Sequence, residues 1–386
     1  MSIYLDNAAT SFPKPESVYE AVVQAMREVG ASPGRGGHRR SLEASRIIFQ
    51  AREAAARLFS IPDSSRIIFT HNATGALNLA LHGTLAEGDH VITTSMEHNS
   101  LVRPLHALRG EGVDVAVIQA GSDGLVDPDD IRTALRANTR MVAVGHISNV
   151  CGAIQPIDRI AALCHEAGAL FLLDAAQSTG SVTIDVISTG IDLLAAPGHK
   201  GLLGPPGTGL LYVAPHVGLK PILEGGTGTS SSSEEQPLTM PDGFETGTHN
   251  LPGIAGLKAG IDFIHENGID AIFRHERNLL DEAEFLLNSI PGFCVYGPTD
   301  KTLRGSVMSF TVSGVDASLL AAELDHGFDI AVRAGLHCAP QAHRTLGTFP
   351  GGTIRLSPGW FNTSEEIAFF SDAVVQCVNK IRESAH

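Results

Sequence analysis

Two charged residues stand where strand-like apolar runs end. Asp174 follows the run 170–173, and Lys200 lies 26 residues further along (200 − 174), in a turn rich in Gly and Pro between two apolar runs. A carboxylate at such a place is costly unless a cation or a strong donor pairs with it. Each residue alone also has an ordinary interpretation, Asp174 as a helix N-cap or turn aspartate and Lys200 as a solvated loop lysine.

A third feature is the small, hydroxyl-bearing turn around Thr74, which follows Ile68-Phe69-Thr70 and opens a helix. The amides and dipole at a helix N-terminus suit a phosphate, although an ordinary threonine N-cap explains this turn alone. Together, an amine, a carboxylate and such a helix start are what pyridoxal phosphate needs. The lysine forms the Schiff base, the aspartate keeps the pyridine nitrogen protonated, and the helix holds the phosphate. His98, after another apolar run, would add a ring stacker, an interpretation with little weight by itself.

Short apolar runs between residues 65 and 215 alternate with helical stretches. We predict strands at Arg66–Thr70, His90–Thr94, Val113–Gln119, Met141–Ile147, Leu170–Leu173, Leu193–Ala195 and Gly209–Val213. The helices predicted between them are Gly75–Leu85, Leu101–Arg109, Asp129–Ala137 and Ile157–Ala167. This alternation predicts an α/β fold with a mostly parallel seven-stranded sheet covered by helices on both faces. Ligands of such sheets bind outside the carboxyl ends of the strands, where Asp174 and Lys200 lie.

The pattern changes after about residue 260 and indicates a smaller α+β domain. We predict helices at Ile269–Ser289, Ala317–Asp325 and Ser364–Arg382, and strands at Phe293–Tyr296, Val307–Val312, Ile330–Arg333 and Thr353–Leu356. Residues 225–243, rich in Gly, Ser and Pro, are expected to form an exposed, mobile loop.

Composition excludes several classes of function. The chain has 386 residues and a net charge of −15, which repels phosphate backbones and anionic lipid, so we expect neither nucleic-acid nor membrane partners. We find no apolar run of transmembrane length and no signal-peptide layout, and we expect a cytoplasmic protein. The five cysteines are scattered and form no Cys-x-x-Cys pair, which argues against a disulfide framework and against structural zinc. The phosphate-loop motif of nucleotide enzymes is absent from the sequence.

A set of motifs runs through essentially the whole chain in one order. They are Tyr4-Leu-Asp-Asn-Ala-Ala-Thr10, Arg35-Gly-Gly-His38, Asn72-Ala-Thr-Gly75, Met96-Glu-His98, His146-Ile-Ser-Asn149, Asp174-Ala-Ala-Gln177, Gly198-His-Lys200, Glu245-Thr-Gly-Thr248, Arg333-Ala-Gly-Leu-His-Cys338 and Thr353-Ile-Arg355. The ordered set resembles the cysteine desulfurase and selenocysteine lyase family, short-loop type, within the class V aminotransferase group of fold-type I pyridoxal phosphate enzymes. The resemblance implies an N-terminal segment (1–20) packing with the small domain, a large cofactor-binding domain (21–258) and a small C-terminal α+β domain (259–386).

The resemblance also implies a role for individual residues. Lys200 would form the Schiff base with pyridoxal 5′-phosphate, Asp174 would pair with the pyridine nitrogen, and His98 would stack on the ring. The other implied cofactor contacts are Gln177 at the ring oxygen, Asn149 beside ring and substrate, Ala73, Thr74 and His199 around the phosphate, and Thr248 reaching that phosphate from the neighbouring subunit of a homodimer. The implied substrate contacts are Arg355, whose guanidinium suits a carboxylate, Asn149 beside the substrate, and Asn7, Ala8 and Arg35 in segments that line the entrance.

Cys338 decides the chemistry that the resemblance implies. In family members with a short Arg-x-Gly-x-His-Cys loop, this cysteine takes sulfur from the cofactor-bound substrate. Alanine leaves, and a persulfide remains for transfer to an acceptor such as a sulfur-acceptor protein. We expect the cations Arg333 and His337 to favour the Cys338 thiolate. The ordinary alternative is a buried, inert thiol, which we assign to the other four cysteines.

Two positions depart from the family pattern. Pro197 stands where many relatives have a phosphate-binding serine, and it offers neither a hydroxyl nor an N–H. The phosphate must then be held by Thr74, His199, Thr248 and backbone amides. Leu336 replaces the first histidine of the His-His-Cys version of the loop. This leaves the choice among cysteine, selenocysteine and another thio amino acid open.

Other functions compete with cysteine desulfuration. Selenocysteine lyase would use the same Cys338, whereas transamination, epimerisation or carbon–sulfur cleavage without a persulfide would not need it. A non-catalytic scaffold of the same fold has no use for Lys200, Asp174, Arg355 and Cys338 together. The identity of the sulfur acceptor is open as well.

Overall fold

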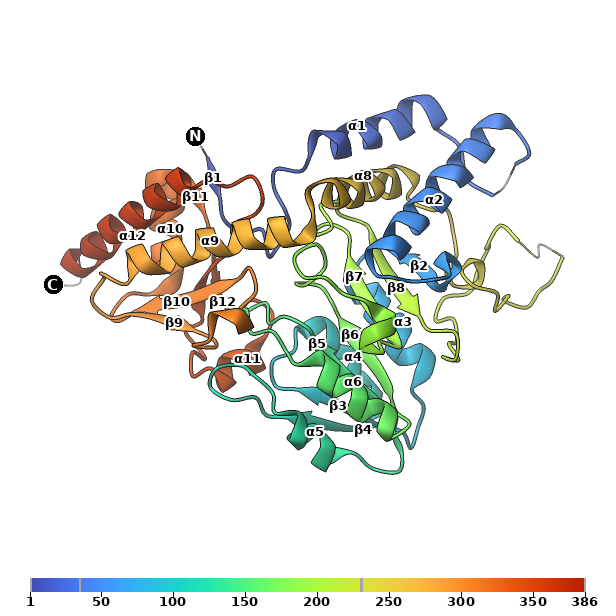
Figure 1. Cartoon of the computed structure of the whole chain (residues 1–386), viewed down its shortest axis with the longest axis horizontal. Helices are drawn as coiled ribbons and strands as arrows, with labels where there is room; N and C mark the ends of the chain where they lie inside the picture. Colours follow the sequence, from blue (N-terminus) through green and yellow to red (C-terminus); the bar gives the residue numbers. More distant parts are fainter. Residues whose placement is uncertain (1, 35, 230–231, 385–386) are drawn as a thin grey trace.

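The largest element of the computed structural model, which describes residues 2–34, 36–229 and 232–384, is a seven-stranded sheet (Figure 1). Across the sheet the strands are β2 (Ile67–Thr70), β8 (Gly209–Val213), β7 (Leu193–Pro197), β6 (Leu170–Asp174), β5 (Thr139–Gly145), β3 (His90–Thr94) and β4 (Asp114–Ile118). The five strands from β7 to β4 run parallel, and β8 is antiparallel to both of its neighbours. The predicted α/β fold with a mostly parallel seven-stranded sheet is confirmed.

The strands form where apolar side chains occur in unbroken runs. β3, β6, β7 and β8 are buried along their whole length, as expected of strands covered on both faces. Helices α3 and α6 pack against these strands, and α2 packs against α8. The helices of this part are α1 (Glu16–Gln24), α2 (Arg39–Leu58), α3 (Ala73–Thr84), α4 (Asn99–Gly110), α5 (Pro128–Ala134), α6 (Ile157–Glu166), α7 (Val186–Thr189) and α8 (Leu251–Asn267).

The parallel strands bring their carboxyl ends to one edge of the sheet. β6 pairs with β7 so that Asp174 lies opposite Ala195, and β5 pairs with β6 so that Gly145 lies opposite Asp174. The segments that follow β5, β6 and β7 therefore meet at this edge. This explains why Asn149, Asp174 and Lys200 lie together although separate loops carry them.

A second hydrophobic core lies at the left of Figure 1. Its antiparallel sheet has the order β12 (Arg333–Gly335), β13 (Thr353–Leu356), β10 (Met308–Val312) and β9 (Phe293–Tyr296). The helices of this part are α9 (Ile269–Leu287), α10 (Ala317–Phe328), α11 (Pro340–Thr345) and α12 (Ser364–Ser384). Apolar side chains of α9, α10 and α12 complete this core.

One predicted strand is wrong. Instead of a continuous strand over Ile330–Arg333, the chain forms β11 (Ile330–Ala331) and β12, which belong to different sheets. β11 pairs in parallel with β1 (Ile3–Tyr4), whereas β12 pairs with β13. The local apolar pattern could not reveal the break, because the partner of β11 lies at the other end of the chain.

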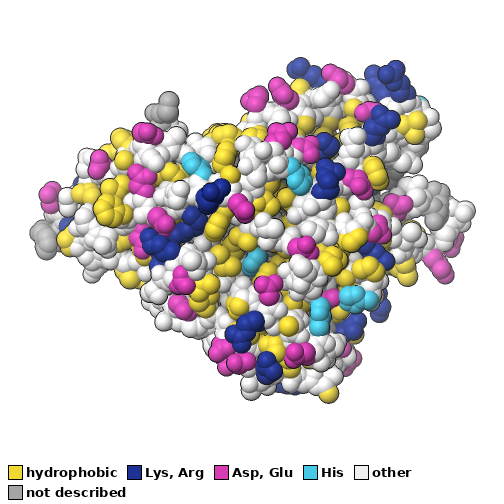
Figure 2. Space-filling view, viewed as in Figure 1, with side chains coloured by type: hydrophobic (Ala, Val, Ile, Leu, Met, Phe, Trp, Pro, Cys, Tyr) yellow, Lys and Arg dark blue, Asp and Glu magenta, His cyan; other side chains and the backbone are white. Residues whose placement is uncertain are grey.

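The organisation into segments stays a prediction. Helix α8 runs unbroken through residues 258 and 259, where we expected the two domains to meet, and α1 packs against α8. Within the described part of 225–243, the regular structure is the start of a single-turn helix, Asp242–Phe244. Figure 2 shows acidic and basic side chains interspersed over one face of the molecule.

Candidate active site

A cavity of about 240 Å³ opens between the carboxyl edge of the large sheet and the small antiparallel sheet. Segments from the N-terminus to β13 converge on it. Ten predicted site residues line it: Ala8, Ala73, Thr74, His98, Asn149, Asp174, Gln177, His199, Lys200 and Arg355.

A carboxylate and an amine line this cavity from neighbouring strand ends. Asp174 ends β6 and its Oδ1 accepts from the amide of Ala176 at 3.0 Å. Burial raises the pKa of Asp174, so a donor to its carboxylate would be stabilising. Burial also lowers the pKa of Lys200 to about 8, against the opposing charge of Asp174. Near neutral pH such an amine has a useful unprotonated fraction, as a nucleophile needs.

The start of α3 lies at the same cavity. Asn72 caps this helix, because its Oδ1 accepts from the amide of Gly75 at 2.8 Å. The Thr74 hydroxyl oxygen is 2.9 Å from that of Ser100, which is 2.8 Å from Nδ1 of His98. Two hydroxyl groups therefore connect the helix start that is predicted to bind phosphate with His98, which is predicted to stack on the cofactor ring. Sequence analysis missed Ser100, whose available signal was its place two residues after His98.

His98 has a neutral ring. Burial, and after it the positive charge of Lys200, lowers the pKa of His98 to about 4. The ring also caps α4, because Nδ1 accepts from the amide of Ser100 at 3.0 Å. A ring that is uncharged and fixed in this way is suited to stacking on an aromatic cofactor.

The peptide before Lys200 is held by the N-terminal segment. The His199 carbonyl accepts from the Ser11 amide (3.0 Å), the Thr10 hydroxyl (3.1 Å) and Nζ of Lys14 (3.3 Å). Burial lowers the pKa of Lys14 to about 8 and that of His199 to about 4, so the His199 ring is neutral at pH 7. A segment distant in sequence therefore fixes the backbone that carries the lysine.

Gln177 and Pro197 complete this side of the cavity. Nε2 of Gln177 donates to the Ala8 carbonyl at 3.1 Å, which ties the segment after β6 to the N-terminal segment. Pro197 ends β7 at the cavity wall and can donate no hydrogen bond there. Donors at the wall must come from its neighbours.

Arg355 brings a guanidinium to the cavity from β13, with only 1% of the residue exposed. Its Nη2 donates to Oδ1 of Asp6 at 2.6 Å and its Nη1 to the Asn149 carbonyl at 3.2 Å. Burial lowers the pKa of Arg355 and the ion pair with Asp6 opposes that change, so the residue stays a cation. Each terminal nitrogen has a second N–H, which suits the binding of a substrate carboxylate.

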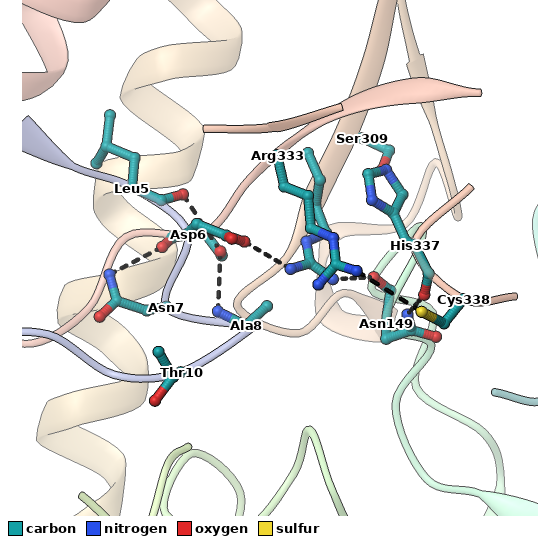
Figure 3. A network of polar contacts seen from close by, with 12 residues as sticks. Leu5, Asp6, Asn7, Ala8, Thr10, Asn149, Ser309, Arg333, His337 and Cys338 are labelled. Carbon is teal, nitrogen blue, oxygen red and sulfur yellow. Dashed lines mark hydrogen bonds and ion pairs between the residues drawn. The ribbon is translucent and has the colours of Figure 1, made fainter. Parts of the chain in front are cut away.

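Cys338 is exposed and follows the cavity residue His337 directly (Figure 3). Nη2 of Arg333 is 3.7 Å from the Cys338 sulfur, so one expected cation is in place. The expectation for His337 is wrong. Burial, with the charge of Arg355, lowers the pKa of His337 to about 2, and its neutral ring is hydrogen-bonded to Thr353. His337 therefore brings no positive charge to the thiol.

Two other predicted site residues in the described ranges do not line this cavity. Asn7 lines a neighbouring cavity, and its Nδ2 donates to the Ser357 carbonyl at 3.0 Å. Thr248 is exposed and lies beside His71, away from the cavity of its own chain. Its contact with a partner subunit's phosphate stays a prediction. Arg35 lies outside the described residues.

Two acidic residues at the site had no role in the sequence analysis. One is Asp6, the partner of Arg355, whose signal was that it is the only charged residue of the motif from Tyr4 to Thr10. The other is Glu97, which lies deep in the cavity wall and is hydrogen-bonded to Thr94 and to the amide of Gly145. Burial raises the pKa of Glu97 to about 8, so it is mostly protonated at neutral pH. Like Asp174, it follows an apolar strand, and that signal could have identified it.

The described ranges contain neither a metal cluster nor a membrane-spanning helix. No group of three or more His, Cys, Asp or Glu side chains there is arranged to hold a metal ion. None of the helices in the same ranges is both long enough and apolar enough to cross a bilayer.

Comparisons with known proteins agree with this geometry. The chain matches the family described as aminotransferase class-V over residues 3–370. It is 38% identical to a probable cysteine desulfurase of Methanothermobacter thermautotrophicus, over 96% of this chain and 94% of that protein. It is 32% identical to a cysteine desulfurase of Haloferax volcanii, over 99% and 89%. The apo structure of the Thermococcus onnurineus cysteine desulfurase superposes with a TM-score of 0.91 at 33% identity, covering 98% of this chain and 95% of that one.

Proposed function

The chain belongs to the cysteine desulfurase family of class-V aminotransferases, and from that premise we propose that it converts L-cysteine to L-alanine and retains the sulfur on Cys338 as a persulfide. The observation that carries this proposal is the placement of the Cys338 thiol. Its sulfur lies 3.7 Å from Nη2 of Arg333. Cys338 also directly follows His337, which lines the cavity together with Lys200, Asp174 and Arg355. A thiol near a cation and accessible to solvent is in the setting that a reactive cysteine needs.

The residues that line the cavity fit pyridoxal 5′-phosphate, the cofactor that class-V aminotransferases generally use. In the described structure the buried carboxylate of Asp174 accepts one hydrogen bond, from an amide, and a protonated pyridine nitrogen would supply the second donor. Lys200 would bind the cofactor's aldehyde. Thr74, His199 and the start of α3 would hold its phosphate, and His98 would cover its ring.

When bound, this cofactor supplies an electron sink for the carbon atoms of an attached amino acid. Arg355 binds the substrate carboxylate through N–H groups that Asp6 and Asn149 leave free, which orients the substrate. Lys200, with a pKa of about 8, takes a proton from the substrate α-carbon and returns one near neutral pH.

Sulfur transfer requires no external oxidant or reductant. The Cys338 thiolate attacks the sulfur of the substrate, so that a sulfur–sulfur bond forms as the carbon–sulfur bond breaks. The electron pair of the broken bond stays on carbon, which takes up a proton, and alanine leaves. Carbon is reduced, the two sulfur atoms are oxidised to the level of a persulfide, and the step balances.

The test compares wild type with Cys338→Ser, using the holoenzyme with L-cysteine or L-selenocysteine and a reductant, and quantifies alanine. We expect alanine from L-cysteine with wild type and its loss with Cys338→Ser. The matched control is Cys294→Ser, which should retain activity. The expectation that Cys294 is buried is wrong, because its thiol is exposed like that of Cys338. Alanine from selenocysteine alone would indicate a selenocysteine lyase. No alanine from either substrate, despite bound yellow cofactor, would contradict both activities.

Three finer statements belong to the same proposal. The enzyme acts as a homodimer in which Thr248 reaches the partner subunit's phosphate, it passes its persulfide sulfur to an acceptor protein, and it works in the cytoplasm. Each rests on the sequence and on the family.

A further inference from the structure

The turn that carries Cys338 has an unusual backbone. The amide of Ala339 donates to the Leu336 carbonyl at 2.8 Å, which closes a tight turn with His337 and Cys338 at its centre. Their φ angles are +48° and +60°. Turns with positive φ at both central residues favour Asn and Gly, because other side chains are strained there. Such strain persists only where the surrounding structure holds it, and it gathers at functional sites.

Three contacts from outside the turn hold these two residues. Nδ2 of Asn149 donates to the His337 carbonyl at 2.7 Å, and the amide of Asn99 donates to the Cys338 carbonyl at 2.8 Å. Nε2 of His337 is 3.0 Å from the Thr353 hydroxyl oxygen. The Asn149 contact is buried and is the shortest of the three. Figure 3 shows Asn149 and His337 beside Cys338.

Asn149 also touches the residue that binds the substrate carboxylate. Its backbone carbonyl accepts from Nη1 of Arg355 at 3.2 Å. The backbone here is fixed without the Asn149 side chain, since the Ser148 hydroxyl accepts from the amide of Val150 and the Ser309 hydroxyl donates to the Val150 carbonyl. Removal of the Asn149 side-chain amide therefore leaves the contact between the Asn149 carbonyl and Arg355 in place.

We propose that Asn149 is a positioning residue for the Cys338 thiol. Its side-chain amide holds the left-handed turn that presents the sulfur, while its carbonyl holds Arg355, so one residue sets the distance between the bound substrate and the nucleophile. This role is separate from a contact with ring or substrate, for which the second N–H and the Oδ1 of the side chain remain available. The sulfur-transfer part of the proposal rests on the proposed function.

The test is a double-mutant cycle on the rate at which the holoenzyme forms persulfide in a single turnover at saturating L-cysteine. Glycine adopts positive φ without strain, so His337→Gly should relieve the turn of its need for Asn149. We expect Asn149→Ala to slow persulfide formation about tenfold alone and less than about threefold in the His337→Gly background. Ser371→Ala, which removes a buried hydroxyl bonded within helix α12, is the control and should stay within about twofold of wild type.

An equal loss in both backgrounds would overturn the proposal, since a substrate contact cannot be rescued at residue 337. If His337→Gly is inactive, His337→Asn serves the same cycle, because Asn also tolerates the left-handed region. Hydrogen exchange supplies a readout without turnover. The amide of Ala339 should exchange faster in Asn149→Ala but not in Ser371→Ala, and unchanged exchange would contradict the role. A failure of the proposed function can be distinguished from a failure of the Asn149 proposal. Wild type would then form no persulfide, whereas the exchange measurement would still test the role of Asn149.

Discussion

The two sides of the active-site cavity are held in different ways. On the sheet side, Asp174 and Lys200 follow buried parallel strands, whose backbone ladders fix their positions. On the opposite side, called the loop side here, strand β13 carries Arg355, but its guanidinium is oriented by Asp6 and the Asn149 carbonyl, and the Cys338 turn is held by the Asn149 side chain. The sheet side carries the groups for the cofactor, and the loop side carries the groups for the substrate and its sulfur. Cofactor binding and sulfur transfer should therefore respond to different substitutions.

The largest effect is expected on the sheet side. Lys200→Ala removes the amine that would bind the cofactor and move protons, so alanine formation should fall by about 10³-fold or more. The visible absorption of the lysine-bound cofactor should disappear with it. Lys220→Ala, which removes an exposed lysine, is the control and should leave both unchanged. Retention of the absorption in Lys200→Ala would break the assignment of Lys200.

On the loop side, Asp6→Asn should lower stability with little change in cofactor absorption. It removes the counter-charge of Arg355, whose side chain is 1% exposed against 18% for Asp6. A buried cation left without its partner should lower the free energy of unfolding by about 2 kcal/mol, measured by urea denaturation.

A surface ion pair provides the comparison for that change. Glu323→Gln breaks the exposed pair with Lys380 and should have little effect on the urea midpoint. Equal effects of Asp6→Asn and Glu323→Gln would contradict the view that Asp6 supports the loop side.

The last effect concerns pH and the sheet side. Burial raises the pKa of Glu97 from 4.5 to about 8, so between these values the folded protein holds a proton that the unfolded chain has released. The free energy of unfolding should therefore fall with rising pH across this window, by up to about 1.4 kcal/mol per pH unit from this group. Glu97→Gln stays uncharged and should remove that contribution. The measurement is urea denaturation of wild type and Glu97→Gln at pH values from 5 to 8. If the free energy of unfolding changes with pH at the same slope in both proteins, the protonation assigned to Glu97 is wrong.

The same contrast explains what the sequence could predict. Asp174 and Lys200 were found because a charged residue after an apolar strand is a local signal, and parallel strands bring such residues together. The pair of Asp6 and Arg355 was not found, because they lie 349 positions apart in the sequence and no local sequence pattern indicates their contact. The split of β11 from β12 was missed for the same reason.

The charge of His337 needed a different kind of information. The sequence shows a histidine beside a cysteine, and only burial shows that its ring is neutral. The left-handed turn was hidden as well, because neither of its two central residues, His337 and Cys338, is the Gly or Asn that signals such a turn. Functional sites often break local rules in this way, and the structure around them must then be known.

The most direct test of the central claim is to locate the sulfur. The holoenzyme would receive one equivalent of L-cysteine without reductant, and its peptides would be analysed by mass spectrometry. We predict that the peptide with Cys338 gains one sulfur atom, which a thiol reductant removes, and that the peptide with the exposed Cys294 gains none. Alanine formed while Cys338 stays unmodified, or sulfur found on Cys294 instead, would contradict the assignment of Cys338 as the sulfur acceptor.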